Sequence, residues 1–174
     1  MFIEFDREIK TLDELKNYLI EKNINLPEYR CAVIALILDK DENILLQRRG
    51  PKSRDEFNKL EDIGGAFEDS DITFRDAMNR EIIEEVGEKI NYTIDELVGA
   101  ALVNKFDSRS DTYVNWLFFL YKCTYIDGEL LINEPGKCLG YEFYKYDELP
   151  RKETAKTTLE FWDYYYNKKD TLSE

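Results

Sequence analysis

Histidine is absent from this sequence of 174 residues, and cysteine, proline and glycine are scarce, with 3, 4 and 8 copies respectively. Without histidine the protein cannot have a Ser-His-Asp or Cys-His nucleophile pair, a His-ligated zinc site or a histidine general base. Any proton transfer must therefore use carboxylate, Lys, Tyr or Cys side chains. The cysteines, Cys31, Cys123 and Cys138, are odd in number and lack C-x-x-C spacing, so we expect free thiols in a reducing compartment.

Long hydrophobic runs and excess positive charge are also missing. The longest apolar run spans residues 31–38, which is much shorter than the ~20 residues of a membrane-spanning helix. The N-terminus, MFIEFDREIK, has no apolar segment of the signal-peptide type, so we expect a cytoplasmic protein. Asp and Glu number 37 against 24 Lys and Arg, giving a net charge of −13. This charge argues against broad binding to nucleic acid or membranes, and a phosphorylated substrate would need a cation as intermediary.

The residues that are present predict one globular domain over residues 1–174, with hydrophobic residues at 43% and charged residues at 35%. We expect an N-terminal helical appendage up to about residue 28, a core over about 30–150 and a C-terminal helix over about 152–168. Thr11 and Glu14 form a capping pattern for a helix over 11–22. Apolar and β-branched runs predict strands at 31–38, 44–49, 97–104, 112–124 and 140–146. Helical spacing predicts a helix over 73–86 that ends at Gly87, and a last helix capped by Thr154 and followed by a frayed tail.

One stretch of the chain gathers acidic residues on a helix. At 3.6 residues per turn, Glu81, Glu84 and Glu85 share an arc of about 100°. The other side of this helix carries aliphatic residues that can pack on a sheet: Ile82, Ile83 and Val86. The three carboxylates repel one another, and a divalent cation such as Mg²⁺ or Mn²⁺ would relieve the repulsion and bind phosphate oxygens. The alternative is a solvated acidic helix face.

The spacing around these acids resembles the box of the Nudix hydrolases (MutT-like pyrophosphohydrolases), G-x5-E-x7-R-E-U-x-E-E-x-G-U, where U is aliphatic. Residues 80–87, REIIEEVG, match the second half of the box without a gap. Asp71 stands where the family usually has Glu, eight residues rather than seven separate it from Arg80, and Glu88 replaces the final aliphatic residue. These departures leave the role of Asp71 open. The likeness covers about residues 30–150.

The resemblance implies an α/β (α+β) fold with a mixed β-sheet sandwiched between α-helices. It also implies that Glu81, Glu84 and Glu85 hold Mg²⁺ or Mn²⁺, with the carbonyl of Gly64 or Gly65 completing the ligand set. Arg80 would orient Glu81 through a charge-assisted hydrogen bond. A metal-activated water would attack a phosphorus atom of a diphosphate, with a carboxylate as general base. The candidates for this base are Glu81 and four residues of later loops: Asp107, Asp111, Glu129 and Glu134.

The substrate must be recognised by residues outside the box. Arg48 and Arg54 lie in the most basic segment of the chain and are candidates for binding substrate phosphates, although each can equally be a solvated loop residue. Tyr141, Phe143 and Trp116 are candidates for stacking on a base, although most strand aromatics belong to a core. Residues 133–150 are similar to elements of triphosphate-directed members, which favours a nucleoside triphosphate. A nucleoside diphosphate-linked compound such as ADP-ribose or a nucleotide sugar stays close behind.

Other classes of function stay open at this point. The alternative from a different class is a non-catalytic module that senses a ligand or binds a partner, which the intact glutamates disfavour. A role in RNA cap processing is a third possibility, disfavoured by the acidic charge. We expect a small-molecule nucleotide substrate and a monomer or homodimer.

Overall fold

The computed structural model describes residues 1–53 and 56–173, and side chains as far as Asp170. Its centre is a mixed sheet with strand order β1-β6-β7-β2-β3-β4, to which β5 is added on β2 and β8 on β3. The strands are β1 (Phe2–Ile3), β2 (Arg30–Leu38), β3 (Ile44–Arg49), β4 (Leu60–Glu61), β5 (Ile63–Ala66), β6 (Ile90–Asp107), β7 (Thr112–Gly128) and β8 (Cys138–Tyr144). The helices are α1 (Leu12–Glu21), α2 (Phe74–Val86), the short 3-10 helix η1 (Tyr146–Glu148) and α3 (Lys156–Ser173).

Strand β2 is the central strand of the sheet. It runs parallel to β7 and antiparallel to β5, and Val33 pairs with both Phe119 and Gly65. Its side chains alternate between two hydrophobic cores, with Val33 in one core and Leu36 in the other. Burial on both faces explains why this strand reads as a continuous apolar run.

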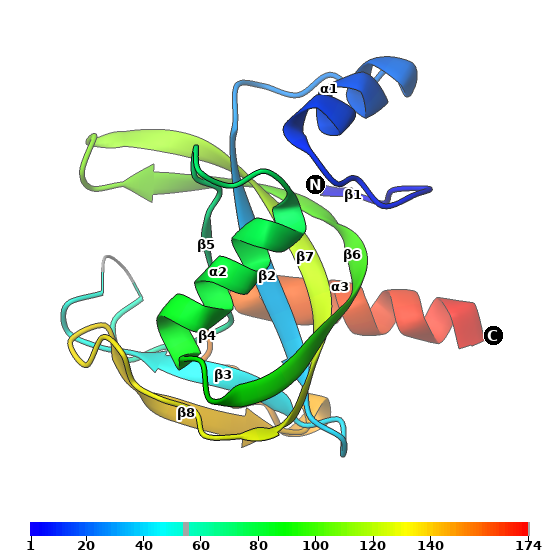
Figure 1. Ribbon diagram of the computed structural model, residues 1–174. Coiled ribbons are helices and arrows are strands. Elements are labelled where there is room, and N and C mark those ends of the chain that lie inside the picture. The colour runs from blue at the N-terminus through cyan, green and yellow to red at the C-terminus, as the bar shows by residue number, and fades with distance from the viewer. Residues whose placement is uncertain (54–55, 174) are drawn as a thin grey trace.

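The helices cover the two faces of the sheet, as the resemblance implied (Figure 1). Helices α1 and α2 contribute to the core on one face, and α3 contributes Phe161 and Trp162 to the core on the other. Ile82 and Val86 of α2 are fully buried, as predicted. The prediction for Ile83 was wrong, because this residue points away from the sheet and is 40% exposed.

The N-terminal segment is part of the sheet and of the core. The prediction of a helix over 11–22 is confirmed by α1, which Thr11 caps by accepting a hydrogen bond from the Glu14 N–H. No pattern in the sequence indicated β1, which pairs with β6. Ile9 and Leu15 are each 1% exposed in the larger core. Arg75 of α2 donates two hydrogen bonds to the carboxylate of Glu8, which ties this segment to α2.

Helix α3 differs from its prediction at both ends. It begins at Lys156, and Thr154 does not cap it, because the Thr154 hydroxyl donates to the Pro150 carbonyl and its backbone pairs with Leu60. Its backbone stays helical to Ser173, so the predicted frayed tail is wrong. Strands β6 and β7 are longer than predicted, and β8 begins and ends two residues earlier. Within the described part of the chain, none of the helices is long and apolar enough to cross a membrane.

Candidate metal and phosphate site

Helix α2 is fixed at both ends by the residues that predicted its boundaries. Thr73 and Asp76 form a reciprocal capping box, in which each side chain accepts a hydrogen bond from the backbone of the other. Gly87 ends the helix with a φ of 91°, a conformation that favours glycine. Both ends are therefore determined locally, which holds the acidic face of α2 in register with β5.

The glycines of β5 face the acidic residues of α2. A Cβ atom on Gly65 would lie 2.3 Å from Oε1 of Glu81, so the carboxylate of Glu81 rests directly on this glycine. The N–H of Gly64 donates a hydrogen bond of 3.1 Å to Oε2 of Glu85. The strand thus contacts two of the three glutamates through its backbone, and a side chain at residue 65 would displace the first of them.

Arg80 lies at the centre of a network of carboxylates. Its Nε and Nη2 atoms donate to the two oxygens of Asp71, at 3.0 and 2.7 Å. Its Nη1 atom donates to Glu81 at 2.9 Å and to Glu84 at 3.3 Å. The Asp71 side chain, which is 5% exposed, therefore binds the Nε and Nη2 side of the guanidinium, and the Nη1 side bonds to the glutamates. The geometry therefore assigns Asp71 to the support of Arg80.

The surroundings of these acids shift their pKa values in different directions. Burial raises the pKa of Glu85 to about 8, with the neighbouring charge of Glu81 acting in the same direction. Burial also raises the pKa of Glu81, against the opposing effect of Arg80. The hydrogen bonds from Arg80 hold the pKa of Asp71 below its usual value. Glu81 and Glu85 consequently gain from a neighbouring cation, whereas Asp71 already has one.

A cavity of about 800 Å³ opens over the acidic face of α2. Glu81, Glu84 and Glu85 line it together with Gly65. Cationic residues from four other segments also line it: Arg49, Lys52, Arg109 and Lys137. Acidic and basic side chains thus face one another across a space open to solvent, an arrangement suited to a metal ion and the phosphates that it binds.

The donor chemistry of this cavity fits a hard divalent cation. Carboxylate and carbonyl oxygens are the ligands that Mg²⁺ and Mn²⁺ prefer. No three acidic side chains among residues 1–53 and 56–173 are yet gathered closely enough to hold a metal ion. The Nη1 atom of Arg80 donates hydrogen bonds to both Glu81 and Glu84 and so supplies positive charge between these two carboxylates. The side chain of Glu84 is 54% exposed and can rotate toward the other two glutamates.

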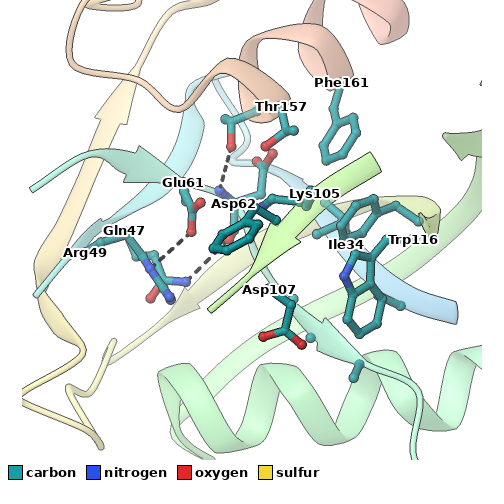
Figure 2. Close-up of a pocket in the computed structure, with 17 residues that line it drawn as sticks. Ile34, Gln47, Arg49, Glu61, Asp62, Lys105, Asp107, Trp116, Thr157 and Phe161 are labelled. Carbon is teal, nitrogen blue, oxygen red and sulfur yellow. Dashed lines mark hydrogen bonds and ion pairs between the residues drawn. The ribbon is translucent and has the colours of Figure 1, made fainter. Parts of the chain in front are cut away.

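Two of the predicted substrate-binding residues, Arg48 and Tyr141, do not line this cavity. Arg48 binds Glu142 through two hydrogen bonds, of 2.6 and 3.1 Å. It lines neither this cavity nor a smaller adjoining recess of about 230 Å³ (Figure 2). The hydroxyl of Tyr141 lies 2.8 Å from the carbonyl oxygen of Glu85 and 2.7 Å from that of Leu131, so it supports the end of α2. Arg54 lies outside the described residues.

Several residues of the cavity were not singled out from the sequence. Lys52 belongs to the basic segment, and Lys137 lies within residues 133–150, which are similar to family elements, so both regions gave a signal. Arg109 lies in the turn between β6 and β7, for which the sequence offered none. Among the candidates for the general base, Glu134 lines the cavity beside Lys137, with 3.2 Å between their charged atoms. Asp107 lines the neighbouring recess instead. Asp111 and Glu129 line neither space.

Known protein structures share this fold. The MutT NUDIX hydrolase of Burkholderia pseudomallei is 23% identical, with a TM-score of 0.59 over 79% of this chain and 98% of its own. A MutT protein of Methanosarcina mazei is 19% identical, with a TM-score of 0.65 over 83% of this chain and 99% of its own. The NUDIX domain of NrtR from Shewanella oneidensis, solved with ADP-ribose, is 14% identical, with a TM-score of 0.62 over 90% and 96%.

No curated protein sequence matches this chain. The family model described as the NUDIX domain, however, matches residues 28–165, which include all of α2, the glycines of β5 and Glu134. This match covers most of the chain and contains the acidic cavity. The chain therefore belongs to the NUDIX domain family.

Proposed function

We propose that this protein hydrolyses a diphosphate bond in a nucleoside triphosphate or a nucleoside diphosphate-linked small molecule. The observation that carries the proposal is the apposition of Glu81 and Glu85 to the β5 glycines inside a cavity that basic residues also line. The MutT proteins of Burkholderia pseudomallei and Methanosarcina mazei and the NUDIX domain of NrtR, which was solved with ADP-ribose, have the same fold. A single domain over residues 1–174 carries the activity.

A divalent cation, Mg²⁺ or Mn²⁺, is held in this proposal by Glu81, Glu84 and Glu85 with the carbonyl oxygen of Gly64 or Gly65. When bound, the cation lowers the pKa of a water molecule and neutralises charge on the phosphates. Arg80 orients Glu81, and Asp71 holds the guanidinium of Arg80 in place by accepting two hydrogen bonds from it. These two residues position a ligand and do not themselves touch the substrate.

The remaining polar residues of the cavity bind phosphate oxygens and accept a proton. Lys52, Arg109 and Lys137 line the same space as the glutamates and supply positive charge to the phosphates. With histidine absent, the base that takes a proton from the attacking water is a carboxylate. Glu81 and Glu134 are the two candidates of the sequence that line the cavity.

The activity is tested by phosphate and pyrophosphate release from a panel of nucleoside triphosphates, ADP-ribose, nucleotide sugars and dinucleoside polyphosphates. We expect hydrolysis of at least one class in Mg²⁺ or Mn²⁺, and none in excess EDTA. A protein that hydrolyses nothing with either metal, but whose melting temperature rises with one of these compounds, would instead be a ligand-sensing module.

The general base is identified by comparing Glu81→Gln with Glu134→Gln on the best substrate. Loss of the base lowers kcat by about 100-fold or more and leaves the affinity for Mn²⁺ in place. Loss of a metal ligand weakens Mn²⁺ binding and kcat together. If Glu134→Gln leaves kcat unchanged, Glu134 is not the base.

A further inference from the structure

The connection between β7 and β8, residues 129–137, contributes two charged side chains to the acidic cavity. Glu134 and Lys137 both line that space. The connection is irregular along its whole length, so contacts with neighbouring elements set its position. Figure 1 shows it in yellow beside the cyan loop that follows β3. It is attached at two places, on the helix of the proposed metal ligands and on this basic loop.

The first attachment is to the last turn of α2. The side-chain amide of Asn133 donates hydrogen bonds to the carbonyl oxygens of Glu84, at 3.0 Å, and Ile83, at 3.3 Å. The last carbonyls of a helix lack donors within the helix, so a side-chain amide placed there stabilises the helix end. Asn133 directly precedes Glu134 in the chain. These hydrogen bonds therefore connect the backbone of one proposed metal ligand to the backbone of a candidate for the general base.

The second attachment is to the loop after β3. The N–H of Gly50 donates to the carbonyl of Lys137, and the N–H of Lys52 donates to the carbonyl of Gly136, each at 2.7 Å. A Cβ atom on Gly136 would lie 2.5 Å from Cδ and 3.1 Å from Cβ of Lys52. The aliphatic part of Lys52 thus rests on Gly136. A side chain at residue 136 would push Lys52 out of its place in the cavity wall.

Glu134 sits in a turn between these two attachments. Its carbonyl oxygen accepts hydrogen bonds from the N–H groups of Lys137, at 2.9 Å, and Cys138, at 3.0 Å. Its carboxylate lies 3.2 Å from the Nζ atom of Lys137. The turn holds Glu134 and Lys137 together, and the attachments on either side of it fix the pair relative to α2.

We infer that Asn133 and Gly136 are positioning residues for the proposed hydrolysis. Asn133 places Glu134 relative to the glutamates of α2, and Gly136 places Lys52 where it binds substrate phosphates. The inference rests on the proposed function, in which Glu134 is a candidate for the base and Lys52 binds phosphate. It predicts that the two ends of one connection serve different kinetic parameters, because one end positions a proton acceptor and the other a binding group.

The test is the steady-state kinetics of Asn133→Ala and Gly136→Ala in the full chain with Mg²⁺ and the best substrate. We expect Asn133→Ala to lower kcat by about 10-fold and to change KM by less than about 2-fold, since a displaced base slows the chemical step. Gly136→Ala should raise KM by about 5-fold and leave kcat near the wild-type value, since Lys52 contributes to binding. General disruption of the connection would change both parameters alike in both variants.

The matched control is Ile132→Ala, in the same connection. Ile132 is 42% exposed and lines neither the cavity nor the recess, so this variant should have wild-type kinetics. Two variants with the kinetics of Ile132→Ala, or with the same change in kcat and KM as each other, would overturn the inference.

A binding measurement separates this inference from the proposed activity. The probe is methylenediphosphonate, a diphosphate analogue that cannot be hydrolysed, titrated calorimetrically in Mn²⁺. Gly136→Ala should bind it about 5-fold more weakly than the wild type and Ile132→Ala equally well. Weaker binding by Gly136→Ala in a protein that hydrolyses no diphosphate would refute the proposed activity and keep the role of Gly136. Equal binding by all three proteins would overturn that role.

Discussion

At the scale of single residues, Arg80 connects two parts of the box through its hydrogen bonds. It bonds to Glu81, in the part that matches the family, and to Asp71, in the part that departs from it. Asp71 has a shorter side chain than glutamate, and one additional residue separates it from Arg80. The structure places both Asp71 oxygens on the guanidinium nonetheless, and the N–H of Glu68 donates to one of them. The inserted residue therefore does not separate the acid from its arginine.

Asp71→Asn should lower kcat/KM by about 10- to 100-fold, because Arg80 then loses its charged partner and orients Glu81 less precisely. Steady-state hydrolysis of the best substrate measures this effect. The matched control is Asp69→Asn, an exposed residue of the same loop that should leave kcat/KM unchanged. Equal kcat/KM values for the two variants would show that Asp71 does not help to position Arg80 and Glu81.

Glu85 makes the stability of the metal-free protein depend on pH. Its pKa rises from 4.5 to about 8 in the folded protein, so the folded state holds this proton more tightly than the unfolded state does. The stability that the protonated form provides is fully present below about pH 4.5 and is lost as the pH rises to about 8. A cation bound at the site reverses the loss.

We therefore expect Glu85→Gln to melt at a higher temperature than the wild type at pH 9 in EDTA, and at a similar temperature near pH 4. Mg²⁺ should raise the melting temperature of the wild type more at pH 9 than at pH 5. Thermal denaturation across this pH range measures both effects. Identical pH profiles for the two proteins would show that folding does not raise the pKa of Glu85.

At the scale of elements, β5 and α2 form the site by close approach. A Cβ atom on Gly65 would meet the Glu81 carboxylate, which is a movable side chain, whereas a Cβ atom on Gly64 would lie 2.3 Å from the backbone oxygen of Val33. Gly65→Ala should therefore fold and lose activity by about 10-fold or more, since Glu81 is displaced. Gly64→Ala should lower the melting temperature. Circular dichroism and kinetics on both variants test this contrast, and an active Gly65→Ala enzyme would contradict it.

At the scale of the whole molecule, the N-terminal segment belongs to the core that supports α2. Ile9→Ala should lower the free energy of unfolding by about 2–5 kcal/mol, since it empties a fully packed position. The matched control is Ile20→Ala in α1, because Ile20 is 79% exposed and should contribute little. Urea denaturation measures both variants. If Ile9→Ala leaves the free energy of unfolding unchanged, the N-terminal segment is an appendage and not part of the core.

The sequence predicted what local signals determine. The helical spacing over residues 73–86 and the glycine at 87 were sufficient for α2, and the apolar run was sufficient for β2. Tertiary contacts determined the rest. Two residues are too few to give β1 a strand pattern. Near the predicted end of α3, Lys168 donates a hydrogen bond to the carbonyl of Val98 in β6, a contact that the sequence pattern does not reveal. Lys137 and Arg109 reach the site from loops, and no periodicity marks a loop residue.

The most direct test of the central claim compares the turnover of Glu85→Gln with that of Glu88→Gln, using the best substrate in Mg²⁺. Both substitutions remove one carboxylate near the end of α2, but Glu85 lines the cavity and Glu88 is an exposed residue outside it. We predict that Glu85→Gln lowers kcat/KM by about 100-fold or more and that Glu88→Gln leaves it unchanged. Equal turnover in the two variants would contradict the assignment of the acidic face of α2 as the catalytic metal site.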